Sequence, residues 1–210
     1  MKSPFPPRIR LYSRTFYSFL VIQHKVFYVY ILQFKYYTFI FVQIVKDEVI
    51  VDLYCGVGYY TIPFLLHGKA AHVHACEWNT NSLIAIKENL KKAGEDVVSR
   101  CTVYAGDNRE SVAKLTGVAD RVCLGLLPSS TQGWPLAVSV LKSTGGVLHV
   151  HENVRDSEVG SWTVDSCQQF MDMFRAAGTP MTVTCRHTER VKSYAPHVLH
   201  IVVDLVCTPI

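Results

Sequence analysis

The chain has 210 residues, of which 49% are hydrophobic and 18% charged, and its formal net charge is +4. This length is enough for one domain with a substantial core. The mild positive charge permits an RNA substrate. It is too small for a protein that binds nucleic acid by a large excess of basic residues alone.

Residues 1–45 are crowded with aromatic and β-branched side chains and contain no acidic residue. Lys25 and Lys35 divide this apolar segment into pieces shorter than the roughly 20 residues of a spanning helix, and a signal-peptide pattern is absent. A membrane partner is therefore disfavoured. Three interpretations stay open: strand-rich structure packed on the domain, an anchor at a membrane or protein interface, or an alternative start outside the folded unit.

The main domain is expected over residues 46–210, where short apolar strands alternate with helices. The pattern predicts a strand at 47–54, a helix at 61–71 and a second strand at 72–78. The next helix, at 81–94, is well marked. Its apolar face carries Leu83, Ile86, Leu90 and Ala93, and Gly94 occupies the position of a left-handed C-terminal residue.

The rest of the chain continues the alternation. The further expected elements are a strand at 101–107, a helix at 110–117, a strand at 120–127, a helix at 133–145, a strand at 146–154, a helix at 161–178, and two strands at 180–191 and 197–207 joined by KSYAP (192–196). This order predicts an α/β, Rossmann-like fold with a seven-stranded, mostly parallel sheet. The last two strands form an antiparallel C-terminal hairpin at its edge, as in class I S-adenosylmethionine-dependent transferases.

Seven cysteines are spread along the chain, and most lie in apolar runs such as VHACEW (73–78). The number is odd and there is no CxxC pair, which argues against a disulfide framework and against a zinc site. We expect buried thiols, no metal and a cytoplasmic location.

The stretch VDLYCGVGYY (51–60) places Asp52, Gly56 and Gly58 directly after the first strand. Glycines there let the backbone turn sharply and let a ligand approach the amides at the start of a helix. The dinucleotide fingerprint needs a third glycine, where this chain has Tyr59 and its neighbours. Large side chains would obstruct a pyrophosphate, but they could line a pocket for a ligand that has no pyrophosphate. An ordinary strand-to-helix turn is the alternative.

Polar residues follow the next two strands. Glu77, before Trp78, is placed to accept hydrogen bonds from both ribose hydroxyls of a nucleoside. Asp107 and Asn108 are placed to read an adenine, although they are also typical of a helix start. Together with the glycine turn, these strand ends predict a crevice for S-adenosylmethionine, an adenosine without phosphates.

The fourth strand is followed by GLLPSS (125–130). Amino-group methyltransferases usually carry Asn or Asp before Pro-Pro here, whereas Leu127 cannot accept a hydrogen bond from a target amine. The two serines are expected to offer small polar groups to the substrate instead.

Six segments resemble, in order, the wybutosine-synthesising protein 2 family of tRNA aminocarboxypropyltransferases, relatives of the tRNA guanine-37 N1-methyltransferases. They are DLYCGVGYYTIPFLLHGKAAHVHACEWN (52–79), GDNR (106–109), ADRVCLGLLPSS (119–130), GWPLA (133–137), GGVLHVHENV (145–154) and VKSYAPHVLHIVVDL (191–205). The resemblance runs from about Asp47 to the C-terminus.

The resemblance implies transfer of the 3-amino-3-carboxypropyl group of S-adenosylmethionine to 4-demethylwyosine at position 37 of tRNA(Phe), beside the anticodon. It implies that Glu77 holds the ribose, Asp107 and Asn108 the adenine, and that the glycine loop and Pro128 line the pocket. The full predicted set of cofactor contacts is Asp52, Gly56, Gly58, Tyr59, Glu77, Trp78, Asp107, Asn108 and Pro128.

No general base is assigned, because the substitution demands alignment more than proton transfer. His151, His197 and Tyr194 lie near strand ends and are candidates to touch the base. Structural roles, as satisfied histidines and a turn tyrosine, are favoured for them. No obligate protein partner is indicated.

The resemblance does not extend to residues 1–45, where the family has a tRNA-recognition portion. We therefore expect weak S-adenosylmethionine binding and reduced tRNA affinity and turnover. Two other functions stay open: a guanine-37 N1-methyltransferase, and a non-catalytic truncated product.

Overall fold

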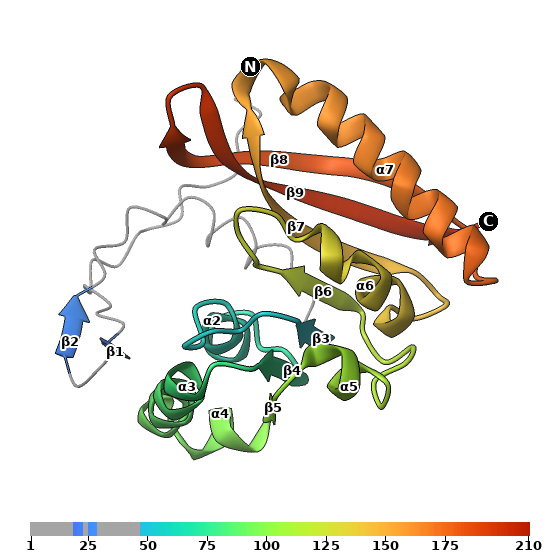
Figure 1. Ribbon diagram of the computed structural model, residues 1–210. Helices are drawn as coiled ribbons and strands as arrows, with labels where there is room; N and C mark the ends of the chain where they lie inside the picture. The colour runs from blue at the N-terminus through green and yellow to red at the C-terminus, as the bar shows by residue number, and fades with distance from the viewer. Residues whose placement is uncertain (1–18, 23–24, 29–46) are drawn as a thin grey trace, which may run out of the picture.

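The computed structural model describes residues 19–22, 25–28 and 47–210, and a seven-stranded sheet runs through the middle of the main body (Figure 1). Its strands are β3 (Val49–Asp52), β4 (His72–Glu77), β5 (Cys101–Ala105), β6 (Arg121–Leu124), β7 (Gly146–Arg155), β8 (Met181–Ala195) and β9 (Val198–Pro209). Two short strands, β1 (Phe19–Ile22) and β2 (Lys25–Tyr28), form a separate antiparallel pair. The rest of the 1–45 segment, with its three interpretations, lies outside the described residues.

The strand order is β5-β4-β3-β6-β7-β9-β8. Strands β3 to β7 are parallel, and β9 runs antiparallel between β7 and β8. The chain first builds outward from β3 to β5 and then resumes on the other side at β6. Ligands of open α/β sheets bind at such a reversal, beyond the carboxyl ends of the strands. The predicted Rossmann-like fold with its C-terminal hairpin is confirmed.

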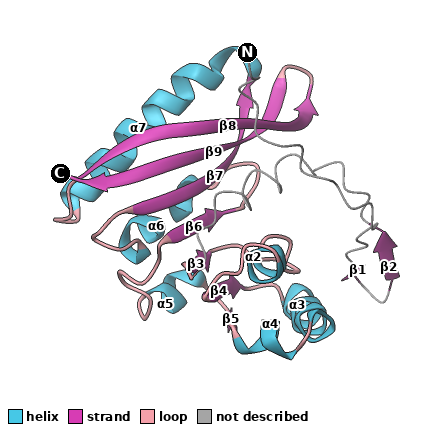
Figure 2. Cartoon of the chain, turned by 180° about the vertical axis from the view of Figure 1, so that it is seen from behind, coloured by secondary structure: helices cyan, strands magenta, loops and turns pink. Residues whose placement is uncertain are grey.

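Helices cover both faces of the sheet (Figure 2). They are α2 (Thr61–Leu66), α3 (Thr80–Ala93), α4 (Glu95–Ser99), α5 (Asn108–Val112), α6 (Trp134–Val140) and α7 (Val159–Ala176), with 3-10 turns η1 (Thr131–Gly133) and η2 (Asp156–Glu158). Each face has its own apolar core. Phe64 and Ile86 are buried in the core under α2, α3 and α4, and Trp134 stacks on Phe170 at 4.5 Å under α6 and α7.

Four helix predictions need correction. The helices expected over 110–117 and 133–145 already end at Val112 and Val140. The helix expected over 61–71 ends at Leu66, because the N–H groups of His67 and Gly68 both donate to Pro63 O, and Lys69 rather than Gly68 takes the positive φ. Gly94 does have a positive φ of 116°, but with ψ 160° it is not in the left-handed helical region. A short helix, α4, starts directly after it and was not predicted.

The C-terminal hairpin is longer than expected. Most of KSYAP belongs to β8, and the turn consists of Pro196 and His197, the latter with φ 60°. Three register shifts interrupt the pairing of β8 with β9. Because β-bulges absorb single extra residues, the strand continues through a sequence that looks like a loop.

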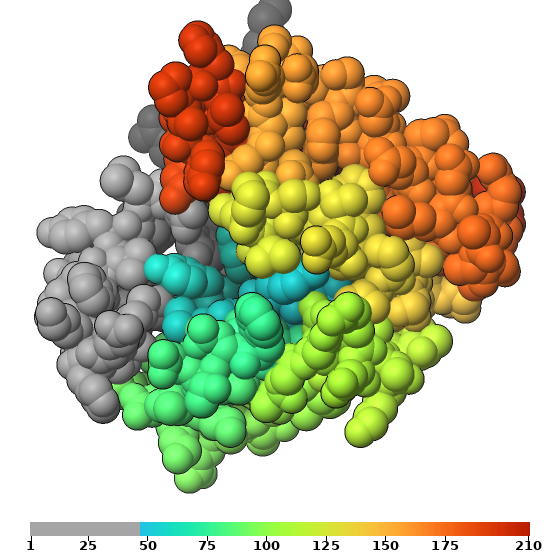
Figure 3. All heavy atoms as spheres, in the orientation of Figure 1, coloured from blue at the N-terminus to red at the C-terminus, as the bar shows by residue number. Residues whose placement is uncertain are grey.

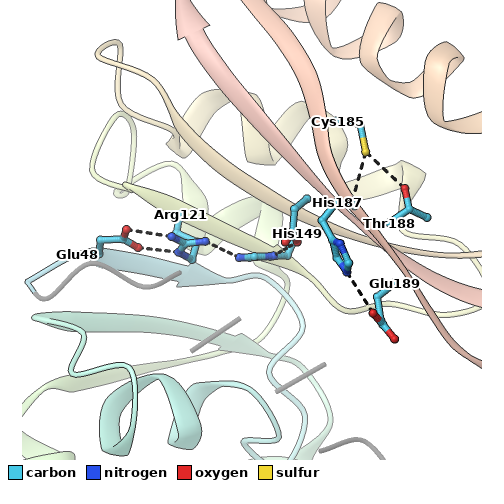
Figure 4. A network of polar contacts seen from close by, with 8 residues as sticks. Glu48, Arg121, His149, Cys185, His187, Thr188 and Glu189 are labelled. Atoms are coloured by element: carbon cyan, nitrogen blue, oxygen red, sulfur yellow. Dashed lines mark hydrogen bonds and ion pairs between the residues drawn. The ribbon is translucent and has the colours of Figure 1, made fainter. Parts of the chain in front are cut away.

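A row of charged and polar side chains crosses the sheet from Glu48, just before β3, to β9 (Figure 4). The Arg121 guanidinium donates to Glu48 Oε2 at 2.6 Å and Oε1 at 2.9 Å, and its Nη1 lies 2.7 Å from His149 Nε2. His149 Nδ1 lies 2.5 Å from Asp204 Oδ1. Arginine can only donate, so Nε2 accepts and the neutral His149 ring donates its Nδ1 proton to Asp204. Burial lowers the His149 pKa in agreement with this assignment.

None of the described helices is long and apolar enough to cross a membrane. The described residues also contain no group of three or more His, Cys, Asp or Glu side chains placed to hold a metal ion.

Candidate functional site

Asp52, the last residue of β3, holds the glycine turn in place. Its fully buried carboxylate accepts hydrogen bonds from Thr61 Oγ1 at 2.8 Å and from the Tyr54 N–H at 3.4 Å. Burial raises the Asp52 pKa to about 6. These contacts join the end of the strand to the start of α2, so Asp52 shapes the loop on which the other site residues lie.

The two glycines of the turn serve different purposes. Gly58 has φ 96°, and a Cβ there would lie 2.9 Å from Ile62 Cδ1, so close packing with α2 excludes a side chain. Gly56 has φ 56°, but nothing lies within 4 Å of the position of its Cβ. The Gly56 side of the turn is therefore open to a ligand, while the Gly58 side is filled by the protein.

Glu77 stands at the tip of β4 and reaches the glycine turn directly. Its Oε2 accepts from the Gly56 N–H at 2.9 Å, and its Oε1 accepts from the N–H groups of Trp78 at 2.9 Å and Asn79 at 2.6 Å. The carboxylate is thus held at the open side of the turn. These amides take three of its about four lone-pair sites, so one site, on Oε2, is left to accept from a ribose hydroxyl.

Asp107 and Asn108 follow β5, whose tip is tied to β4 by the Gly106 N–H, which donates to Glu77 O at 2.9 Å. Asn108 Nδ2 donates to Leu53 O at 3.1 Å, so this side chain reaches the start of the glycine turn. The Asp107 carboxylate is the N-cap of α5 and pairs with the Arg109 guanidinium, and hydrogen bonds from Arg109 lower its pKa to about 2. The helix-start role of Asp107 is therefore real, and its adenine contact stays a prediction.

Pro128 lies in the loop after β6, the strand at which the strand order of the sheet reverses. The Leu127–Pro128 peptide is cis, and Pro128 O accepts from the Asn153 N–H at 2.9 Å. Nearby, a Cβ at Gly125 would lie 3.9 Å from Tyr54 O, so the loops after β3 and β6 are close neighbours. Figure 3 shows the cyan surface of the glycine turn recessed between the green and the yellow segments.

The two aromatic residues of the predicted set lie at the rim. Tyr59 is 38% exposed and Trp78, directly after Glu77, is 81% exposed. A single exposed apolar side chain is common on protein surfaces, so the ligand contact of Trp78 stays a prediction. The structure thus brings Gly56 and Glu77 into direct contact, and it brings Asn108 to Leu53 at the start of the same turn.

The two serines of GLLPSS do not behave as expected. Ser130 is fully buried, donates to His151 O at 2.9 Å and accepts from Trp134 Nε1 at 3.4 Å, so its hydroxyl is already used within the protein. Ser129 Oγ donates to Glu152 Oε2 at 2.9 Å. Both serines hold the loop against β7. Glu152 was missed from sequence, because only the antiparallel bridge between Ser129 and Glu152 brings them together.

The three further candidates for base contact lie in different surroundings. His151 is 1% exposed, and its Nδ1 lies 3.2 Å from His200 Nε2, so it is a core histidine. His197 is exposed in the hairpin turn, where its carbonyl accepts from the Asp156 N–H at 3.0 Å. Tyr194 is 57% exposed, in β8 rather than in a turn. A hollow of about 710 Å³ beside His197, between the start of η2 and the hairpin, is separate from the glycine turn.

Comparisons with known proteins give the family of the chain. A protein-family model described as "TRM5/TYW2 methyltransferase domain" matches residues 17–176, a range that includes part of the 1–45 segment. Among curated proteins, the tRNA wybutosine-synthesizing protein 2 homolog of Danio rerio is 41% identical over 196 residues, covering 79% of this chain and 47% of that protein. The Homo sapiens homolog is 39% identical over 212 residues, covering 77% and 46%.

Solved structures show the same likeness. The M. jannaschii TYW2 structure in complex with AdoMet has a TM-score of 0.72 at 26% identity, covering 84% of this chain and 76% of that one. The P. horikoshii TYW2 structure in complex with MeSAdo has a TM-score of 0.69 at 27% identity, covering 80% and 60%. The chain spans about half the length, or less, of the curated relatives it matches. It belongs to the TRM5/TYW2 methyltransferase-domain family, and within that family it is similar to the wybutosine-synthesizing protein 2 members.

Proposed function

We propose that this chain is an S-adenosylmethionine-dependent transferase that moves the 3-amino-3-carboxypropyl group to 4-demethylwyosine at position 37 of tRNA(Phe). The observation that carries the proposal is the Glu77 carboxylate, held at 2.9 Å from the amide of Gly56 on the open side of the turn. The relatives of known name and the neighbours solved with AdoMet and MeSAdo support the same crevice.

In this proposal the cofactor spans three strand tips. Glu77 accepts from a ribose hydroxyl through its Oε2, while Asn108 and Asp107 lie beside the adenine. The exposed indole of Trp78 covers one side of the nucleoside and Tyr59 the other. Gly56 has no side chain, so a ligand can approach the backbone of the turn there, and Pro128 closes the crevice from the loop after β6. The domain that carries this crevice is proposed to begin near residue 46.

The choice of transferred group rests on the loop after β6. Leu127 offers no side-chain acceptor to an amine, and Ser129 and Ser130 are bonded to β7. An exocyclic or ring nitrogen is therefore not held in the manner of an amino-group methyltransferase. A carbon nucleophile needs no such acceptor, which favours the aminocarboxypropyl reaction over guanine N1-methylation.

The chemistry is a substitution at carbon. A carbon of the base attacks the terminal methylene of the aminocarboxypropyl arm, the bond from that methylene to sulfur breaks, and its electron pair neutralises the sulfonium. Methylthioadenosine leaves, and the base loses a proton to solvent. The residues named here bind and align the reactants, which is where such a displacement gains most of its rate. The TYW2 neighbour solved with MeSAdo supports this by-product.

The proposed macromolecular partner is the anticodon loop of tRNA(Phe), because position 37 lies beside the anticodon. The proposed location is the cytoplasm. All seven cysteines are free thiols and four of them are buried, as is typical of a reducing compartment.

Mass spectrometry of tRNA(Phe) bearing 4-demethylwyosine, after incubation with the chain and S-adenosylmethionine, tests the proposal. An aminocarboxypropyl adduct with release of methylthioadenosine supports it. A methyl adduct on a guanosine-37 transcript would instead establish the methyltransferase alternative. No adduct on either RNA, with no binding of S-adenosylmethionine by calorimetry, would leave a non-catalytic protein.

A further inference from the structure

The amide of Asn153, on β7, has unmet hydrogen-bonding capacity. Both its Oδ1 and its Nδ2 are buried, and neither has a hydrogen-bond partner in the part of the chain that the structure describes. Buried polar side chains are nearly always hydrogen-bonded, so such an exception needs an explanation. For Asn153 both halves of the amide are involved, a donor and an acceptor side by side.

The backbone at Asn153 is firmly held, so the orientation of the side chain is not accidental. Its N–H donates to Pro128 O at 2.9 Å, on the side of the GLLPSS loop, and the residue pairs with His200 in β9 on the other side. The preceding residue, Glu152, is fixed by Ser129. Asn153 therefore sits where the proposed cofactor crevice meets the second half of the sheet.

Side chains alternate along a strand, so Asn153 shares its face with His151 and His149. The His151 ring lies 5.1 Å from the ring of Tyr60, which belongs to the glycine turn. Asn153 is one step further toward the tip of β7 on this face. The Asn153 amide therefore lies beyond the buried histidine pair, closer to the carboxyl ends of the strands, where ligands of this fold bind.

The structure assigns Asn153 as a specificity-determining residue that hydrogen-bonds the edge of the target base. The inference rests on the proposed function, because a base in an unstacked loop is the ligand that reaches this edge. An amide supplies a donor and an acceptor in one plane, the pattern with which Asn reads the complementary edge of a purine. Bases presented in single-stranded loops are recognised in this way.

The substitution Asn153→Leu tests the assignment, because leucine is similar in size but forms no hydrogen bond. The matched control is Asn89→Leu. Asn89 is 4% exposed, and its Nδ2 donates to Val57 O at 3.0 Å, so that amide joins α3 to the glycine turn. If Asn153 serves the substrate, Asn153→Leu keeps or raises the melting temperature, whereas Asn89→Leu lowers it. A drop for Asn153→Leu as large as the control would overturn the inference.

The second measurement is the ratio of affinities for tRNA(Phe) carrying 4-demethylwyosine and for the same tRNA carrying guanosine at position 37, by filter binding with the full 210-residue chain. Wild type is expected to prefer the modified base, and Asn153→Leu to reduce the preference about tenfold or more, the effect of one bidentate contact. Binding of S-adenosylmethionine is expected to be unchanged. No preference in wild type, or an unaltered ratio in the variant, would overturn the inference.

The role of Asn153 and the proposed function can each fail without the other. If wild type forms the aminocarboxypropyl product and Asn153→Leu leaves the affinity ratio intact, the function stands and the role of Asn153 falls. If no product forms but the preference exists and depends on Asn153, base recognition stands and the transferase proposal falls.

Discussion

In the half of the sheet formed by β5, β4 and β3, carboxylates stand at strand tips and are held by backbone amides. In the half formed by β6, β7 and β9, charged groups lie inside the sheet and are held by one another. Glu77 represents the first arrangement, and the row from Glu48 through Arg121 and His149 to Asp204 represents the second.

The two halves of the sheet are suited to different tasks, because their carboxylates differ in burial. A partly exposed carboxylate on amides can exchange water for a ligand at little free-energy cost. A buried ion row cannot, because removing one member leaves the others without compensation in a medium of low polarity. The tip carboxylates are therefore suited to binding, and the internal row to holding β3, β6, β7 and β9 in register.

The largest expected effect comes from breaking the internal row. Arg121→Met leaves Glu48 and His149 without their main cation, and we expect a loss of about 3–5 kcal/mol in the free energy of unfolding. Urea denaturation measures it. The control is Arg175→Met, which removes an exposed pair with Asp172 and should change stability by less than about 0.5 kcal/mol. Equal effects from both variants would refute the contrast.

The next effect concerns Asp52, a carboxylate that is buried although it belongs to the binding half. Its pKa is raised to about 6 from 3.8, so the folded state holds this proton more tightly than the unfolded state. Its contribution to stability is full below pH 4 and is lost as the pH rises to 6. Asp52→Asn stays neutral, and should exceed wild type by up to about 3 kcal/mol at pH 7.

Denaturation at several pH values, with the variant subtracted from wild type, isolates this group. His200, with a pKa lowered to about 4 by burial, has the opposite effect over the same range, but it is common to both proteins and cancels. Parallel curves for wild type and Asp52→Asn would show that Asp52 does not titrate in this window.

Glu77→Gln sharpens the comparison at the strand tips. The neutral amide loses charge-assisted bonds to the ribose, and we expect S-adenosylmethionine affinity to fall about thirty-fold, equivalent to about 2 kcal/mol. Glutamine keeps one acceptor oxygen in place of two, so at least one of the three backbone N–H groups loses its partner, and the free energy of unfolding should fall by about 1 kcal/mol. Calorimetry and a melting curve on the same sample separate the two. A large fall in stability with unchanged affinity would assign Glu77 to the fold instead.

The smallest effect is expected at a near-surface pair. Lys142 Nζ lies 2.6 Å from Asp120 Oδ1, with both side chains about one third exposed. Lys142→Met should lose no more than about 1 kcal/mol, and the loss should shrink at high salt. Denaturation at low and high ionic strength measures it. An effect as large as that of Arg121→Met would show that burial is not what separates these ion pairs.

The parts that could be predicted from sequence are those with local signals. Alternating apolar runs predicted the strands and helices in chain order, and the residues after the first two strands predicted that Gly56 and Glu77 lie close together, as they do. The internal row could not be predicted, because Arg121, His149 and Asp204 are single residues in separate apolar strands and only the strand register makes them neighbours. Ser130 shows the same limit, since a serine beside proline gives no sign that it will face the core.

The long outer strand β8 has a consequence for how the protein behaves at high concentration. It lies at the end of the described sheet, and its outer backbone edge, which pairs with no other described strand, is a template on which the strand of another molecule can pair. Register shifts bend it, and the exposed Arg186, Arg190 and Lys192 place repulsive charge along it. Deleting a bulge residue and neutralising these cations together should convert a dispersed protein into one that self-associates edge to edge.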